Sequence, residues 1–132
     1  MTAANELLQT IHARLAGDAA MTALIGVDGI VDGLAVRRAL PCLVIGEVET
    51  RAYRTSTEPG EEHFLTIEAW SEANGSRGVQ EIAGLVRDLL DDADLVLASH
   101  ALVSLAHRST RVRRRPKSRH HVAAMRFRAV TE

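Results

Sequence analysis

Two things are scarce in this sequence: cysteine and long apolar runs. Cys42 is the only cysteine, so no disulfide can form within the chain, and the sequence suits a reducing cytoplasm. No apolar run approaches the roughly 18 residues that span a bilayer, and no basic region precedes an apolar stretch at the N-terminus. These absences predict a protein without a membrane segment or an export signal.

The motifs that carry chemistry in small enzymes are absent as well. The six histidines have neither the HExxH nor the Cys/His spacing of a zinc site, and no serine lies in a G-x-S-x-G sequence. Acidic neighbours such as Asp91 and Asp92 fall at the exposed end of an expected helix, where carboxylates are usually only solvated. We therefore expect no catalytic residue, no cofactor and no metal ion, and predict that the protein is not an enzyme.

The chain does have a globular composition, with an uneven distribution of charge. Its 132 residues fit one domain, and 46% of them are hydrophobic and 25% charged, unlike a disordered chain. The net charge is -1, yet the charges are unevenly placed. Residues 101–132 hold nine arginines and lysines and one acidic residue, whereas residues 1–100 hold seven arginines and sixteen acidic residues. The chain is therefore bipolar, with a basic C-terminal third.

Apolar periodicity predicts two long helices. Residues 2–16 and 76–90 place apolar side chains at helical spacing, and Gly17 follows where the first helix would end. A short helix is expected between Asp18 and Gly26. Alternating or β-branched runs predict strands, with turns at Pro59-Gly60 and at residues 116–118; the strands cover residues 42–50, 62–71, 100–112 and about 123–129.

Two long helices and at least four strands, mostly in hairpin order, predict an α+β fold. We expect a single domain over residues 1–132, with an antiparallel-dominated sheet of at least four strands, two main helices packed on one face and a long hairpin. The apolar faces of these elements predict a core of Leu7, Ile11, Leu15, Leu43, Ile45, Leu65, Ile67, Val79, Ile82, Val86, Leu89, Val103, Met125 and Phe127.

Two polar segments outside this core are candidate functional regions. The tip of the first hairpin is predicted to be flexible and to become ordered against a neighbour; its residues are Arg54, Thr55, Glu58, Pro59, Gly60 and Glu61. The second segment is basic, which is typical either of nucleic-acid binding or of a solvated or protein-contacting face; its residues are Arg111, Arg113, Arg114, Arg115, Lys117 and Arg119. It lacks the aromatic side chains on which single strands stack, since Phe127 is expected to face the core.

Several local sequences follow one another in a recognisable order. They are Ala19-Ala-Met-Thr-Ala-Leu-Ile-Gly, Gly29-Ile-Val-Asp-Gly, Pro41-Cys-Leu-Val-Ile-Gly-Glu, Glu61-Glu-His-Phe-Leu-Thr-Ile-Glu-Ala-Trp-Ser, the helix over residues 76–90, Leu95-Val-Leu-Ala-Ser-His-Ala-Leu-Val and Met125-Arg-Phe-Arg-Ala-Val-Thr-Glu. This succession, over nearly the whole chain, resembles the tail-completion or tail-terminator proteins of long-tailed phages and gene transfer agents. The chain departs from its relatives in the turn before the last strand, which is often acidic or contains glycine in them and is basic here.

The resemblance implies a structural virion component that forms a ring, typically of six copies. Such a ring caps the tail tube, stops its polymerisation and joins the tail to the head connector, or stopper, while DNA passes through its lumen. The implied partners are therefore other copies of the chain, the tail tube protein and the connector, with assembly in the host cytoplasm and a final place at the head-tail junction. The alternative is a small nucleic-acid-binding protein that uses the basic segment.

Within such a ring, the basic segment has two expected placements. One is against an acidic cluster of the next copy at the end of the second long helix, formed by Asp88, Asp91, Asp92 and Asp94, because a helix C-terminus disfavours negative charge and is stabilised by nearby cations. The other is towards the lumen, where arginines attract phosphate without reading sequence.

Overall fold

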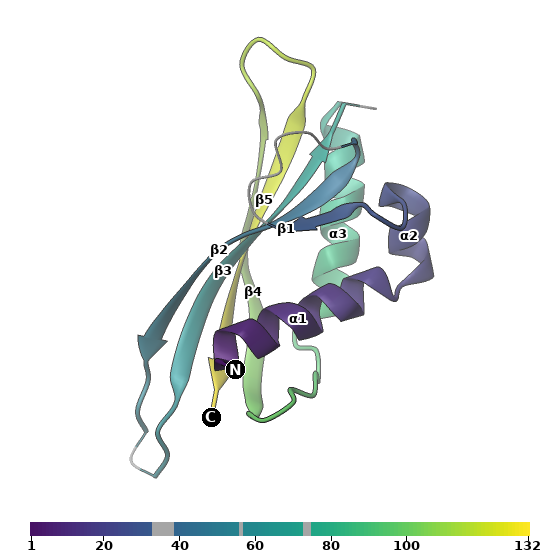
Figure 1. The fold of residues 1–132 in the computed structure, drawn as a ribbon. Helices are drawn as coiled ribbons and strands as arrows, with labels where there is room; N and C mark the ends of the chain where they lie inside the picture. The colour runs from purple at the N-terminus through teal and green to yellow at the C-terminus, as the bar shows by residue number, and fades with distance from the viewer. Residues whose placement is uncertain (33–38, 56, 73–74) are drawn as a thin grey trace.

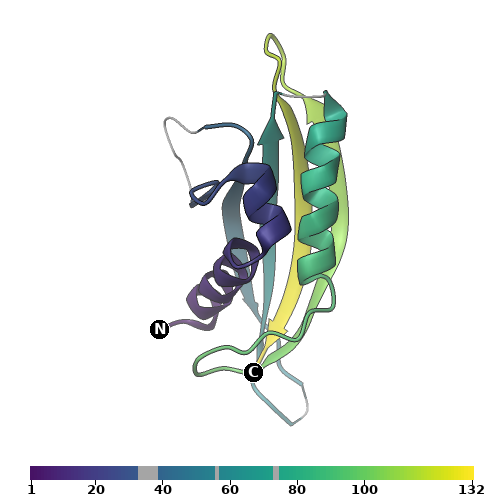
Figure 2. The same ribbon diagram turned by 90° about the vertical axis from the view of Figure 1, so that its right-hand side faces the viewer.

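Three helices lie on one face of a five-stranded sheet in the computed structural model, which describes residues 1–32, 39–55, 57–72 and 75–132 (Figures 1 and 2). The elements follow the order α1 (Ala3–Ala16), α2 (Ala19–Ile25), β1 (Ile30–Asp32), β2 (Cys42–Ala52), β3 (Glu61–Ser71), α3 (Ser76–Leu90), β4 (Leu102–Arg114) and β5 (His121–Thr131). The predicted α+β class and the placement of the helices on one face are confirmed.

The strands are arranged in the order β1-β2-β3-β5-β4. The hairpins β2-β3 and β4-β5 are joined side by side through β3 and β5, and all of these pairings are antiparallel. Strand β1 pairs in parallel with β2 over only three residues, from Ile30 opposite Leu43 to Asp32 opposite Ile45. This fifth strand was not among the elements expected from the sequence.

The two shorter N-terminal helices begin at side-chain caps. The hydroxyl of Thr2 accepts a hydrogen bond from the N–H of Asn5 (3.1 Å), and a carboxylate oxygen of Asp18 accepts one from the N–H of Met21 (2.9 Å). Each cap satisfies one of the donors that a helix start leaves without a partner. Both helices therefore begin where their polar residues predict.

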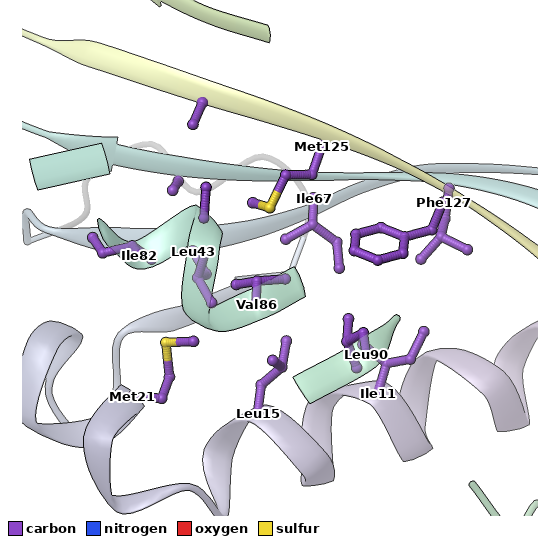
Figure 3. Packing of buried hydrophobic residues seen from close by; sticks show 14 of the residues in the cluster. Ile11, Leu15, Met21, Leu43, Ile67, Ile82, Val86, Leu90, Met125 and Phe127 are labelled. Atoms are coloured by element: carbon purple, nitrogen blue, oxygen red, sulfur yellow. The ribbon is translucent and has the colours of Figure 1, made fainter. Parts of the chain in front are cut away.

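The core fills the layer between the helices and the sheet (Figure 3). Helix α1 contributes Ile11 and Leu15, helix α3 contributes Val86 and Leu90, and these side chains pack towards the strand residues Leu43, Ile67, Met125 and Phe127. Leu90 is fully buried and Leu89 only half-buried, so the apolar face of α3 is turned slightly from the one expected. The other predicted core positions are buried, with one exception.

That exception is Val103, whose predicted place in the core is wrong. Its side chain is 54% exposed, whereas Leu105 is 2% exposed and belongs to the core. The register of β4 against β5 shifts between Leu102 and Ser104, which marks a β-bulge. Val103 and Leu105 would share one face of a regular strand, but the extra residue reverses the alternation between Leu102 and Leu105. Leu102 and Leu105 therefore both pack against the core, and Val103 between them is turned outward.

The two hairpins extend to opposite ends of the molecule. In Figure 1 the β2-β3 tip lies at the bottom, near both chain termini, and the β4-β5 turn lies at the top. Helix α3 starts near the β4-β5 end and runs down towards the other end (Figure 2). The polar segments predicted from the sequence therefore lie far apart in one chain.

Candidate functional site

The basic segment is the β4-β5 hairpin end, and it is held in a defined conformation. Arg111, Arg113 and Arg114 lie on β4, and the remaining three residues, Arg115, Lys117 and Arg119, lie in the turn. The N–H of Arg115 donates to the carbonyl of His120 (2.9 Å), and Nε of Arg114 donates to the carbonyl of Ser118 (3.3 Å). Backbone and side-chain hydrogen bonds thus close the turn.

Trp70 on β3 anchors the base of this turn on the face of the sheet away from the helices. The guanidinium of Arg115 lies 5.2 Å from the centre of the Trp70 ring, a cation–π distance, and the ring of His120 meets Trp70 edge-on at 6.2 Å. His120 also bonds to the carboxylate of Glu72 (3.2 Å). Arg115 is therefore committed to its own chain, whereas the exposed Arg113, Lys117 and Arg119 form no ion pair with the described residues.

The acidic cluster lies where the sequence places it, at the C-terminal end of α3, and part of it protects a sheet edge. Oδ1 of Asp91 accepts a hydrogen bond from the N–H of His107 on β4 (2.8 Å). The N–H of Asp92, which adopts a left-handed conformation with φ of 57°, donates to the carbonyl of Leu105 (2.8 Å). Asp88 and Asp94 are exposed and form no ion pair with the described residues.

The basic turn and the acidic cluster do not meet within one chain. Asp91 is bonded at His107, and Arg114 lies seven residues further along the same strand. At about 3.3 Å per residue this places them more than about 20 Å apart. Figure 2 agrees, with the β4-β5 turn at the top and the end of α3 low in the view.

The β2-β3 tip closes through a short turn of its own. The N–H of Tyr53 donates to the carbonyl of Gly60 (2.8 Å), and the N–H of Thr55 donates to that of Glu58 (3.1 Å). A Cβ at Gly60 would lie 2.9 Å from the carbonyls of Tyr53 and Thr131, so only glycine fits there. Arg54, Thr55, Glu58 and Pro59 are exposed, Glu61 is the first residue of β3, and residue 56 lies outside the described residues.

The uncovered face of the sheet carries acidic and basic side chains around a hollow. This shallow hollow of about 830 Å³ has Phe64 and Thr66 of β3 among its lining residues, and on one side it is bordered by Glu47, Glu49 and Arg51 of β2. On its other side lie basic residues of β4 and β5, namely Arg108 and Arg126. Arg126 and Arg128 point away from the core, as expected, and Nε of Arg128 donates to Glu62 (2.9 Å).

A buried polar cluster beside α1 is not predictable from the sequence. Glu6 is 3% exposed and accepts hydrogen bonds from the N–H of Ser99 (2.7 Å), the hydroxyl of Ser99 (2.5 Å) and Nδ1 of His100 (3.0 Å). Donation by the Ser99 hydroxyl and N–H lowers the pKa of Glu6 to about 2, although burial opposes the shift. More than ninety residues separate the partners, so no local sequence pattern indicates the cluster.

This cluster has the residue types of a catalytic triad without its geometry. In a triad the serine bonds to one ring nitrogen of the histidine and the acid to the other. Here one ring nitrogen, Nδ1 of His100, lies within hydrogen-bond distance of both the Ser99 hydroxyl (3.3 Å) and the carboxylate of Glu6 (3.0 Å), and the Ser99 hydroxyl also donates to that carboxylate. The cluster ties the segment before β4 to α1, and it lacks the two-nitrogen arrangement of a triad.

His63 is a second buried polar residue that no sequence pattern predicts. It is fully buried between two threonines, with Nδ1 2.9 Å from the Thr50 hydroxyl and Nε2 2.9 Å from the Thr131 hydroxyl. Burial lowers its pKa, so the neutral ring is favoured.

Across residues 1–32, 39–55, 57–72 and 75–132, no group of three potential ligands is placed to hold a metal ion. No helix in the same part of the chain is long and apolar enough to cross a bilayer.

Comparisons with known proteins place the chain in a family. The family model described as tail completion protein gp17 matches residues 9–132. A chain in a solved structure of the virion of a native gene transfer agent particle shares 27% sequence identity, with a TM-score of 0.86 over 98% of this chain and 96% of that one. No curated protein matches. The chain is thus a structural component of a phage-type tail and belongs to the tail completion protein gp17 family.

Proposed function

We propose that this protein is a tail terminator, a ring-forming subunit that caps the tail tube, stops its polymerisation and joins the tail to the head connector. The observation that carries the proposal is the likeness, over 98% of this chain and 96% of the other, to a chain of a gene transfer agent virion. Such a role is exercised through surfaces, which fits a fold whose one serine, histidine and carboxylate cluster among the described residues is structural.

The distribution of charge supports assembly into a ring, which we propose contains six copies, each a single domain over residues 1–132. A ring needs heterologous contacts, in which one patch meets a different patch on the next copy. The basic turn and the exposed Asp88 and Asp94 lie at separate places in one chain and are opposite in charge. Neighbouring copies can therefore meet through unlike charges that lie apart within a single chain.

The remaining partners follow from the place of such a ring. Assembled in the host cytoplasm and located at the head-tail junction, it contacts the tail tube protein on one side and the connector, or stopper, on the other. Viral DNA is a partner only while it passes through the lumen. The exposed Lys117 and Arg119, at the tip of the basic turn, are then placed either against a neighbour or towards that DNA.

The experiment that tests the proposal mixes the purified protein with tail tubes and counts capped tube ends in negative stain. We expect rings at tube ends, and tubes that no longer elongate when tube protein is added. A protein that leaves tube ends bare and elongation unchanged overturns the proposal. The Lys117→Glu/Arg119→Glu variant, compared with Lys117→Gln/Arg119→Gln, separates the two placements: loss of rings indicates a neighbour, and normal rings with poor DNA transfer indicate the lumen.

Nucleic-acid binding is the second candidate, because Arg108 and Arg126 on the uncovered face form no ion pair with the described residues. Binding through phosphates weakens steeply with salt. On duplex DNA, a plot of the logarithm of the association constant against the logarithm of the salt concentration has a slope of about -0.9 for each phosphate contacted. A gel shift of arbitrary duplex at low salt that vanishes at high salt, together with bare tube ends, favours this candidate over the terminator.

A further inference from the structure

The sheet has two outer edges that are only partly covered. On one side, β1 covers β2 from Leu43 to Ile45, and no described residue bonds to the outer backbone edge of β2 from Glu47 to Ala52. On the other side, Asp91 and Asp92 cap β4 at Leu105 and His107. Beyond that cap, none of the described residues bonds to the outer backbone edge of β4 from Ser109 to Arg114. Both segments are six residues long, and their backbone donors and acceptors are available to another strand.

These two open segments carry charges of opposite sign. The β2 segment exposes Glu47 and Glu49, of which Glu49 is paired with Arg51 on the same strand (2.8 Å). The β4 segment exposes Arg111, Arg113 and Arg114, none of them in an ion pair with the described residues. Like charges facing one another across strands are destabilising and unlike charges are stabilising. A β4 edge therefore repels another β4 edge and attracts a β2 edge.

The directions of the strands allow this pairing between copies that share one orientation. Each step from β2 to β3, from β3 to β5 and from β5 to β4 is antiparallel, so β4 runs antiparallel to β2. If a second copy extends the sheet of the first, its β2 lies beside the first copy's β4 in the antiparallel sense. The contact is heterologous, as a ring requires, because a different edge of each copy takes part.

The stagger of the open segments has the size that a closed sheet needs. The register places Glu49 level with Phe64, Arg128 and Ala106, whereas the middle of the open β4 segment, Val112, lies opposite Ala123. From Arg128 to Ala123 the stagger is five residues, because the register shift between His107 and Ser109 places one extra residue in β4. Five residues correspond to about 17 Å along the strand, and the four strands from β2 to β4 repeat every 19 Å or so across the sheet. Copies that stay level around a ring must then tilt their strands by about 40°, within the 35 to 45° typical of closed barrels.

We infer that neighbouring copies join edge to edge, the Ser109–Arg114 segment of one β4 pairing antiparallel with the Glu47–Ala52 segment of the next copy's β2. This inference rests on the proposed ring and names the surface that closes it. It also assigns the arginines of β4 a different acidic partner from the end of α3, where Asp91 is already bonded to His107.

Charge reversal at matched places tests the pairing. Arg111→Glu/Arg113→Glu should lower the fraction of ringed tube ends by about tenfold or more, the scale expected when close charge pairs across an interface are reversed. Adding Glu47→Lys/Glu49→Lys should restore the rings, whereas adding Asp88→Lys/Asp94→Lys, a reversal of equal size at the end of α3, should not. All of these side chains are exposed, and an unchanged melting temperature shows that each variant is folded.

The other outcomes contradict the inference. If only the Asp88→Lys/Asp94→Lys pair restores the rings, the arginines lie against the acidic cluster. If both acidic reversals restore them, ring formation depends only on net charge. If neither restores them, edge pairing is excluded. Hydrogen exchange supplies an independent reading, since outward amides of residues 47–52 and 109–114 should become protected together on assembly. Wild-type rings with these amides still unprotected overturn the edge pairing but leave the terminator in place, whereas wild-type protein that forms no rings overturns both.

Discussion

Replacing Leu105 by alanine should destabilise the subunit by about 3 kcal/mol. Leu105 is 2% exposed, and the substitution removes three methylene equivalents at about 0.8 kcal/mol each, to which the unfilled cavity adds. The measured range for such changes is about 2 to 5 kcal/mol, and we take the lower half because an edge strand is free to move inward. For a chain of this length the loss corresponds to a fall of roughly 10 to 15 °C in melting temperature.

Val103→Ala is the matched control, because Val103 lies two residues away on the same strand with its side chain 54% exposed. Substitutions at such positions usually change the free energy of unfolding by less than about 0.5 kcal/mol. Thermal and denaturant unfolding, at concentrations where the subunit does not assemble, measure both variants under the same two-state treatment. Equal losses for the two, or a larger loss for Val103→Ala, would refute the bulge that turns Val103 out of the core while Leu105 stays inside.

Acid should destabilise the subunit through two buried groups, His63 as the pH falls below about 6.5 and Glu6 as it falls below about 4.5. His63 has a lowered pKa when folded, so its contribution is complete above the ordinary value of 6.5 and declines as the pH falls below it; His63→Gln should remove that decline. Glu6 has a folded pKa of about 2 against an ordinary 4.5, so its contribution is present above 4.5 and is lost on descent towards 2; Glu6→Gln should flatten that window, with the exposed Glu81→Gln as control. Melting curves between pH 8 and 2 test both, and unchanged windows in the variants count against these assignments. Finally, the tip from Arg54 to Glu61 should exchange its amide hydrogens quickly in the free subunit and slowly in the ring; equal rates in the two states would contradict its ordering by a neighbour.

The long elements are predictable from the sequence because their periodicity is sustained. Helix α3 repeats apolar residues from Val79 to Leu90, and β5 alternates from Ala123 to Ala129, so single departures do not hide the pattern. Strand β1 has only three residues and pairs in parallel with a strand more than ten residues later, which leaves no alternation to read. The outward place of Val103 depends on a bulge, and a bulge is a property of the pairing rather than of one strand.

The candidate surfaces are predictable in part for the same reason. The basic turn is a continuous run of sequence, so its existence can be read directly, but its anchoring on Trp70 needs the pairing of β3 with β5. The acidic cluster can be read as well, whereas the bond between Asp91 and His107 joins residues on different elements. Glu6 and Ser99 lie still further apart, and only the packed helix-sheet layer brings them together.

The position of β5 has a consequence for how the subunit is made. This strand is the last of the chain, yet it lies between β3 and β4 in the sheet and contributes Met125 and Phe127 to the core. A nascent chain that has not yet emerged beyond residue 121 has nothing to bridge β3 and β4, so its two halves have no common sheet. The sheet is therefore complete only once the residues of β5 have emerged from the ribosome, and a product that stops before them cannot present both edges of one sheet to a growing assembly.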